Sequence, residues 1–148
     1  MFERILLPLD GSALAEQALP YAVALARCQG GTIHVLRVAP ILAPIDVEVS
    51  AIAYQKVMEE ERAAAQSYVE RTVARLRQDG LTAEGKVETG DPAAVILETA
   101  RQIDASAITM ATHGRSGLGR LLFGSVADQV LRGASVPVFL IRATDSRS

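Results

Sequence analysis

The 148-residue sequence has little cysteine and few aromatic residues: one cysteine, Cys28, no tryptophan and an aromatic content of 4%. A single thiol excludes an internal disulfide framework and a metal site built from several cysteines. Long apolar runs are also missing. None approaches the roughly 18 residues that a membrane-spanning helix needs, and the first apolar stretch, residues 5–9, is too short for a signal peptide. We therefore expect a cytoplasmic protein that does not associate with membranes.

A charge excess of either sign is missing as well. Lys and Arg number 15 and Asp and Glu number 17, which gives a net charge of −2. Proteins that hold nucleic-acid backbone usually carry a basic excess, so we expect no nucleic-acid partner. With 49% hydrophobic and 22% charged residues, the composition favours a folded chain. The length suits one domain, which we expect to span residues 1–142, followed by a frayed tail at 143–148.

Short apolar runs and helical periodicity alternate along the chain. The apolar runs predict five strands, at residues 5–9, 32–39, 81–88, 105–111 and 136–141, with the third nearest the sheet edge. Helical spacing and N-cap signals predict four helices: one from Ser12 to Gln29, a long one at 51–79, one that begins with Asp91 and Pro92, and one at 125–133. Two prolines indicate a loop at 40–50, whose conformation the pattern leaves open.

This alternation predicts an α/β fold: a single doubly wound, Rossmann-like domain with a five-stranded parallel sheet and helices on both faces. The expected strand order is 3-2-1-4-5. In such sheets, ligands bind beyond the carboxyl ends of the strands, where the strand order reverses. The loops after the first and fourth strands, at Asp10 and Ala111, are therefore the expected location of a site.

Residues 113–125 carry the most functional information. The stretch contains four glycines and leads into the helix predicted to open at Ser125, where the pattern resembles a capping box with Asp128 in place of Glu. A helix N-terminus favours an anion, and Arg115, Arg120 and Arg132 add positive charge, so the loop predicts phosphate binding. The lysine of a standard phosphate loop is missing. The alternative is that the glycines serve only tight turns and that the arginines are solvated.

Three segments resemble the universal stress protein family. Leu7-Pro8-Leu9-Asp10-Gly11-Ser12 is similar to its opening strand, and Gly90-Asp91-Pro92 to its third crossover. Met110-Ala111-Thr112-His113-Gly114, then nine residues, then Gly124-Ser125-Val126, is similar to the G-x2-G-x9-G-(S/T) signature of its ATP-binding branch. The resemblance runs almost end to end and departs from the signature once, at Ala111. Alanine fits there if the strand end is extended and costs affinity if the position requires a positive φ.

The resemblance implies an ATP site, with Mg²⁺ or Mn²⁺ accompanying the phosphates. It implies that Pro8 and Asp10 line the adenine and ribose pocket and that the backbone at Val38 contacts adenine. Ala111, Gly114, Arg115, Gly124, Ser125 and Val126 would hold ribose and phosphates, and Met110 and His113 complete the expected site. None of these residues is assigned a catalytic role, and no side chain is assigned a metal.

The resemblance also implies a homodimer that pairs through the last strand, at Val136, Val138 and Leu140. The apolar run at 136–141 agrees, because a free apolar edge is an aggregation hazard. Burial of this strand within its own monomer is the alternative.

Together these features predict a nucleotide-dependent regulatory or interaction module of the stress response. At most slow ATP hydrolysis is expected, because the loop offers no lysine and no carboxylate arranged to activate water. Two alternatives stay open. A family member that does not bind ATP would act as a dimeric interaction protein, a reading that Ala111 favours. An adenylate-forming enzyme would carry an S-G-G-x-D-S loop, which Asp10-Gly11-Ser12-Ala13-Leu14 does not match.

Overall fold

The structure, a computed structural model, describes residues 1–41, 51–113 and 124–144. Five parallel strands form one sheet in the order β3-β2-β1-β4-β5. The strands are β1 (Arg4–Pro8), β2 (Thr32–Ala39), β3 (Thr82–Thr89), β4 (Ala107–His113) and β5 (Val138–Ala143). The helices are α1 (Ala13–Glu16), α2 (Leu19–Gln29), α3 (Ala51–Gln78), α4 (Pro92–Gln102) and α5 (Ser125–Gly133). The predicted fold class and strand order are confirmed, with β3 at one edge.

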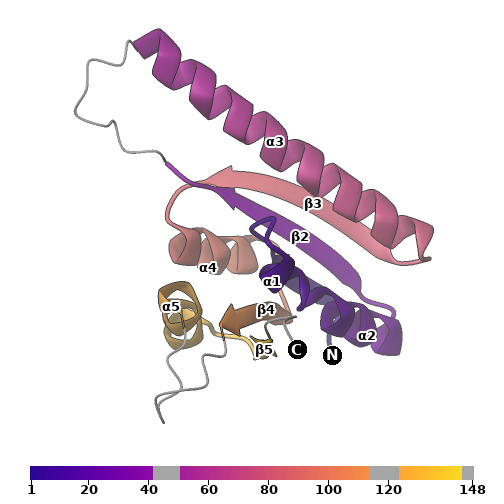
Figure 1. Cartoon of the computed structure of the whole chain (residues 1–148). Helices are drawn as coiled ribbons and strands as arrows, with labels where there is room; N and C mark the ends of the chain where they lie inside the picture. Colours follow the sequence, from indigo (N-terminus) through magenta and orange to yellow (C-terminus); the bar gives the residue numbers. More distant parts are fainter. Residues whose placement is uncertain (42–50, 114–123, 145–148) are drawn as a thin grey trace.

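Helices cover both faces of the sheet (Figure 1). On one face, α2 and α3 pack over Ile5 of β1 and Ile33 of β2. On the other face, α4 and α5 pack over Leu6, Leu36 and Ile108. Because both faces are covered, successive residues of β1 are buried, which explains why this strand is a continuous apolar run in the sequence.

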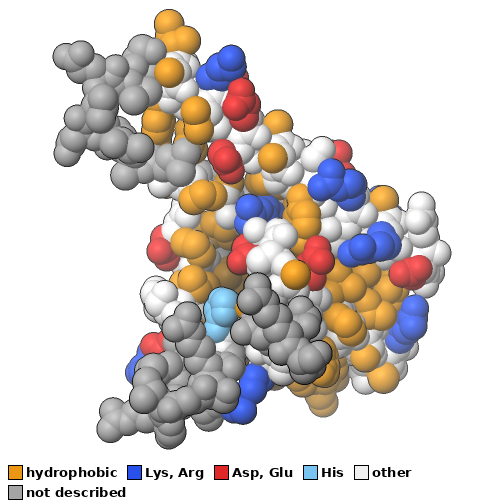
Figure 2. Space-filling model, viewed as in Figure 1, with side chains coloured by type: hydrophobic (Ala, Val, Ile, Leu, Met, Phe, Trp, Pro, Cys, Tyr) orange, Lys and Arg blue, Asp and Glu red, His pale blue; other side chains and the backbone are white. Residues whose placement is uncertain are grey.

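The long helix α3 extends past the sheet that it covers (Figure 1). All of its buried side chains lie in its second half, at Ala65, Val69, Thr72, Val73 and Leu76. Gly85 of β3 permits this close packing, because a Cβ there would overlap the side chains of Val69 and Val73. Acidic and basic side chains are mixed along α3 on the face shown in Figure 2. Within the described ranges, no helix combines the length and apolarity that crossing a bilayer requires.

The first predicted helix is in fact two helices. α1 ends at Glu16 and α2 begins at Leu19. Pro20 explains the break, because a proline has no N–H to donate to the carbonyl four residues earlier, here that of Glu16, and its ring crowds that carbonyl. In the first turn of α2 the missing N–H costs nothing. The predicted Ser12 N-cap is confirmed, since its hydroxyl accepts the Ala15 N–H at 3.1 Å.

The fourth and fifth strands begin two residues later than predicted. Residues 103–106 close the turn after α4, with Asp104 at φ 51, so β4 begins only at Ala107. β5 begins at Val138, directly after Pro137, whose carbonyl accepts the Ile108 N–H at 3.0 Å. Val136, predicted to belong to the last strand, therefore precedes β5 and packs against the core beneath α4 and α5.

The end of β5 corrects the predicted tail. Ala143, predicted to be frayed, is buried and is the last residue of the strand. Thr144 then forms two hydrogen bonds with the Gln17 side chain. Residues 145–148 lie outside the described ranges, as do residues 42–50 of the predicted loop.

Candidate functional site

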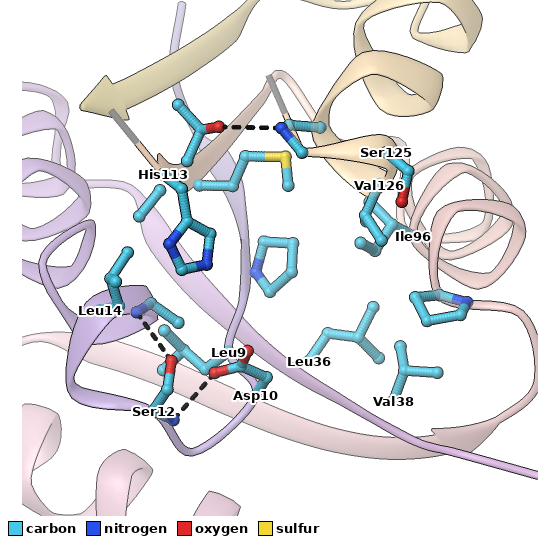
Figure 3. Close-up of a pocket in the computed structure, with 18 residues that line it drawn as sticks. Leu9, Asp10, Ser12, Leu14, Leu36, Val38, Ile96, His113, Ser125 and Val126 are labelled. Atoms are coloured by element: carbon cyan, nitrogen blue, oxygen red, sulfur yellow. Dashed lines mark hydrogen bonds between the residues drawn. The ribbon is translucent and has the colours of Figure 1, made fainter. Parts of the chain in front are cut away.

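A cavity of about 330 Å³ opens at the carboxyl edge of the sheet, beside the ends of β1, β2 and β4 and the first turns of α1, α4 and α5 (Figure 3). The strand order reverses here, since β1 lies between β2 and β4. Each predicted site residue within the described ranges lines this one cavity, namely Pro8, Asp10, Val38, Met110, Ala111, His113, Gly124, Ser125 and Val126. Gly114 and Arg115 lie outside those ranges.

One wall of the cavity is apolar. Leu36 and Val38 of β2 and Ile96 of α4 lie along it, as Figure 3 shows. Leu36 and Ile96 are almost fully buried and belong to the core beneath α4 and α5, so this wall is continuous with that core. The sequence reasoning missed both residues. Leu36 could have been predicted from the sequence, because it lies two positions before Val38 and so faces the same side of the strand.

The turn between β1 and α1 forms the polar side of the cavity. The Asp10 carboxylate accepts the Ser12 N–H at 2.8 Å, and the Ser12 hydroxyl accepts the Ala15 N–H at 3.1 Å. The carboxylate therefore shapes the turn and also lines the cavity (Figure 3). These two bonds link the orientation of Asp10 to the position of α1.

The N-terminus of α5 lies on the opposite side of the cavity. Its N-cap residue is Gly124, at φ −55 and ψ 153, and no side chain caps the helix. The N–H groups of Ser125, Val126 and Ala127 therefore have no acceptor within α5, and these three residues line the cavity. The backbone at Gly124 is held in place, because its N–H donates to the Thr112 hydroxyl at 3.4 Å. A free helix N-terminus of this kind attracts an anion.

The predicted capping box at Ser125 is wrong. Ser125 is the first residue of the helix rather than its cap, and the N–H of Asp128 donates to the Gly124 carbonyl. The Asp128 carboxylate accepts the Nε–H of Arg132 at 3.0 Å. Arg132, predicted to add positive charge near the loop, lies in the last turn of α5 and outside the cavity lining.

Ala111 stands where the ATP-binding signature has its first glycine, and the backbone conformation decides whether alanine fits there. It belongs to β4 and is paired with Ile141 of β5. Among the described residues, the only non-glycine residue with a positive φ is Asp104. The backbone at Ala111 therefore does not require glycine, and its methyl group fits the extended strand end.

Formal charge is scarce in the cavity. Of the described residues that line it, Asp10 is the only Asp, Glu, Lys or Arg. His113, at the exposed end of β4, is the other titratable side chain and is directed into the cavity (Figure 3). Over residues 1–41, 51–113 and 124–144, no three His, Cys, Asp or Glu side chains gather as a metal site would require.

Comparison with known proteins identifies the family. The model of the universal stress protein family matches residues 1–142. The chain belongs to the universal stress protein family. Among curated members, it is 28% identical to universal stress protein YxiE of Bacillus subtilis over 148 residues, which cover 96% of this chain and 100% of the relative.

Solved universal stress proteins share the fold. UspA from Lactobacillus plantarum superposes with a TM-score of 0.80 at 22% identity and covers 95% of this chain and 98% of its own. A universal stress protein in complex with cAMP has a TM-score of 0.63 at 21% identity, covering 97% and 98% of the two chains. An Arabidopsis thaliana family protein with AMP bound has a TM-score of 0.66 at 16% identity, covering 96% and 92%.

Proposed function

We propose that this universal stress protein binds ATP in the cavity at the carboxyl edge of its sheet. The observation that carries the proposal is that one cavity joins an apolar wall to an uncapped helix N-terminus. A purine base suits the apolar wall and a phosphate group suits the helix N-terminus. Proteins of the same fold that hold AMP or cAMP support this class of ligand.

The base and the ribose would occupy the side of the cavity next to β1 and β2. Val38, backed by the buried Leu36 and Ile96, offers an apolar surface for one face of adenine, and the backbone at the end of β2 can exchange hydrogen bonds with the edge of the base. Pro8 lies beside this surface. The Asp10 carboxylate is an acceptor only, so it would bind a group that donates, and the ribose hydroxyls are such donors.

The phosphates would lie against the first turn of α5. The N–H groups of Ser125 and Val126 and the Ser125 hydroxyl are donors that line the cavity there. Gly124 has an ordinary negative φ, and no described atom lies within 4 Å of the position of a Cβ, so neither the backbone conformation nor packing against the described residues requires glycine here. The missing side chain instead leaves room for a phosphate. Gly114 and Arg115 stay predicted contacts.

A divalent cation with the nucleotide fits this donor set. Mg²⁺ and Mn²⁺ favour oxygen ligands, and Mg²⁺ commonly binds through phosphates and waters with few protein carboxylates. The described lining offers one carboxylate, Asp10, and the hydroxyls of Ser12, Thr112 and Ser125. The phosphates and water would therefore supply most of the ligands of the metal, and its positive charge would offset the negative charge of the phosphates.

We propose that the bound nucleotide regulates contacts with other proteins in the cytoplasm during the stress response. Phosphoryl transfer usually relies on cationic groups around the phosphates and on a residue that positions the attacking water. The described lining contains no Lys or Arg, and its titratable side chains are Asp10 and His113. Hydrolysis is therefore expected to be slow at most.

A homodimer through β5 completes the proposal. The Pro137 carbonyl accepts the Ile108 N–H, so odd-numbered residues of β5 turn their polar backbone groups toward β4. The N–H and C=O groups of Val138, Leu140 and Arg142 then face the other edge, where the described residues supply no further strand. Side chains 138–141 of β5 are half-buried in the monomer. A second β5 would satisfy these groups and cover this apolar surface.

Native mass spectrometry of the protein as purified, followed by calorimetric titration with ATP and Mg²⁺, tests both parts. We expect a dimer that carries ATP or binds it with micromolar affinity, about −8 kcal/mol. A monomer would contradict the β5 contact. A protein that neither retains nor binds an adenine nucleotide would contradict the function proposed for the cavity.

A further inference from the structure

The helix α1 forms part of the cavity wall but has no buried residue of its own. Ser12, Leu14 and Ala15 line the cavity, and α1 is only four residues long. A helix of this length is not stable in isolation, because one turn fixes several backbone dihedrals for a single hydrogen bond. Contacts with other elements must therefore hold α1 in place: Ala15 packs against the core beneath α2 and α3, and two polar contacts add to it.

The first contact comes from α3. The Tyr68 hydroxyl donates to the Glu16 carboxylate at 2.8 Å. Tyr68 belongs to the half of α3 that is packed on the sheet, and its ring packs against the core there. Burial, and then the hydrogen bond to Glu16, raise the pKa of Tyr68 well above its usual 10, so the hydroxyl keeps its proton and remains a donor.

The second contact comes from the end of β5. The Gln17 side-chain amide donates to the Thr144 carbonyl at 2.9 Å, and its Oε1 accepts the Thr144 N–H at 3.0 Å. Both polar backbone groups of Thr144 are thus paired with one side chain. Such a two-point contact restrains the direction of the side chain as well as its distance. It attaches the C-terminal side of α1 to the sheet through the residue that follows β5.

We propose that Tyr68 and Gln17 are positioning residues of the nucleotide site. Neither lines the cavity. They act through α1. The Ala15 N–H of this helix donates to the Ser12 hydroxyl, and the Ser12 N–H donates to the Asp10 carboxylate. Once α1 is free to shift, the Asp10 carboxylate loses the turn that orients it toward the ribose. This inference rests on the proposed function, since it assigns Asp10 to the ribose of a bound nucleotide.

The variants Tyr68→Phe and Gln17→Ala test the inference. Each removes the polar contact with α1 and leaves the cavity lining unchanged. Calorimetry would measure the affinity for ATP and for its 2′-deoxy and 3′-deoxy analogues, each with Mg²⁺. Tyr21→Phe and Gln66→Ala are matched controls, because Tyr21 is 53% exposed on α2 and the Gln66 amide bonds Glu70 within α3.

Each variant should bind ATP about threefold to tenfold more weakly, the effect of one or two net hydrogen bonds. One deoxy analogue should bind the wild type more weakly than ATP does, because it lacks the hydroxyl that donates to Asp10. The variants should lose less affinity for this analogue than for ATP, so their preference for ATP should shrink. Gln17→Glu, which keeps the acceptor for the Thr144 N–H but turns a second carboxylate oxygen toward the Thr144 carbonyl, should bind ATP no more tightly than Gln17→Ala. Both control variants should match the wild type.

Three results would overturn the inference. ATP affinity in both variants within about twofold of the wild type would show that α1 needs neither contact. An equal loss for ATP and both analogues would show that the effect does not pass through Asp10 and the ribose. A wild type that binds no adenine nucleotide would overturn the proposed function as well. Thermal unfolding of each variant shows that the titrated protein is folded, so the affinity ratios apply to the intact site.

Discussion

Replacing Gly124 by aspartate tests the phosphate end of the site, because the substitution should raise stability and lower affinity together. Gly124 is the N-cap of α5, in the extended conformation that N-cap residues adopt. No described atom lies within 4 Å of the Cβ position, so the new side chain has room. Its carboxylate can accept the N–H of Val126 or Ala127, which no side chain caps in the wild type.

The two effects differ in sign and in size. Aspartate is a better N-cap than glycine by a few tenths of a kcal/mol, and its charge at the positive end of the helix adds about 0.3–1 kcal/mol. We therefore expect stability to rise by about 0.5–1 kcal/mol. A hydrogen bond to a charged group is worth about 1.5–3 kcal/mol. Losing two such bonds to phosphate, with added repulsion between like charges, should weaken ATP binding at least about hundredfold.

Calorimetry measures the affinity for ATP with Mg²⁺ and the affinity for adenosine, and thermal unfolding measures the stability. Adenosine is the matched control, because it has no phosphate and should bind the variant as it binds the wild type. Gly124→Asn, which caps without a full charge, should lose less ATP affinity than Gly124→Asp. Unchanged ATP affinity in a stabilised Gly124→Asp variant would refute the placement of phosphates at α5. An equal loss for adenosine would show instead that the whole cavity had changed shape.

Three further predictions concern packing, assembly and pH. Gly85→Ala should cost about 1–3 kcal/mol in chemical denaturation, because the methyl group overlaps Val69, whereas Gly124→Ala meets no described atom; equal costs would contradict this reason. Arg142→Pro removes an N–H that faces the open edge and keeps the bonds to β4, so it should weaken the dimer at least about tenfold in sedimentation while Arg142→Ala does not. Burial lowers the pKa of His34 below its usual 6.5, more than Glu84 raises it, so the unfolded chain binds a proton that the folded chain does not. Stability should therefore fall as the pH drops below about 6.5, and urea denaturation of His34→Gln should show a smaller fall than the wild type.

Much of the site was accessible from the sequence because it lies at the ends of strands. A continuous apolar run such as Ile5 to Leu9 is typical of an inner strand of a parallel sheet, so the residue after it, Asp10, falls at the carboxyl edge wherever the helices pack. The glycine spacing around Gly124 adds the second side of the cavity. Both signals are local, and neither requires knowledge of which helix covers which face.

The wrong predictions lie where two sequence signals compete, or where the end of a strand depends on a partner strand far away in the sequence. Helical periodicity continues through residues 12–29, but Pro20 breaks the helix after Glu16. The polar residues after Gly124 suggested a capping box, although Asp128 pairs with Arg132 and leaves α5 uncapped. β5 continues to Ala143 because β4, more than 20 residues earlier in the chain, supplies a ladder partner at His113.

The sequence alone determined the alternation of strands and helices, the parallel sheet, and the placement of Asp10 and Ala111 at its carboxyl edge, because these depend on local periodicity and connection rules. Only the tertiary structure decided that Leu36 and Ile96 share a wall, that the first turn of α5 faces the same cavity uncapped, and that Tyr68 and Gln17 hold α1. Gln17 and Thr144 are 127 positions apart. Contacts over such separations arise from the packing of whole elements, which no local pattern records.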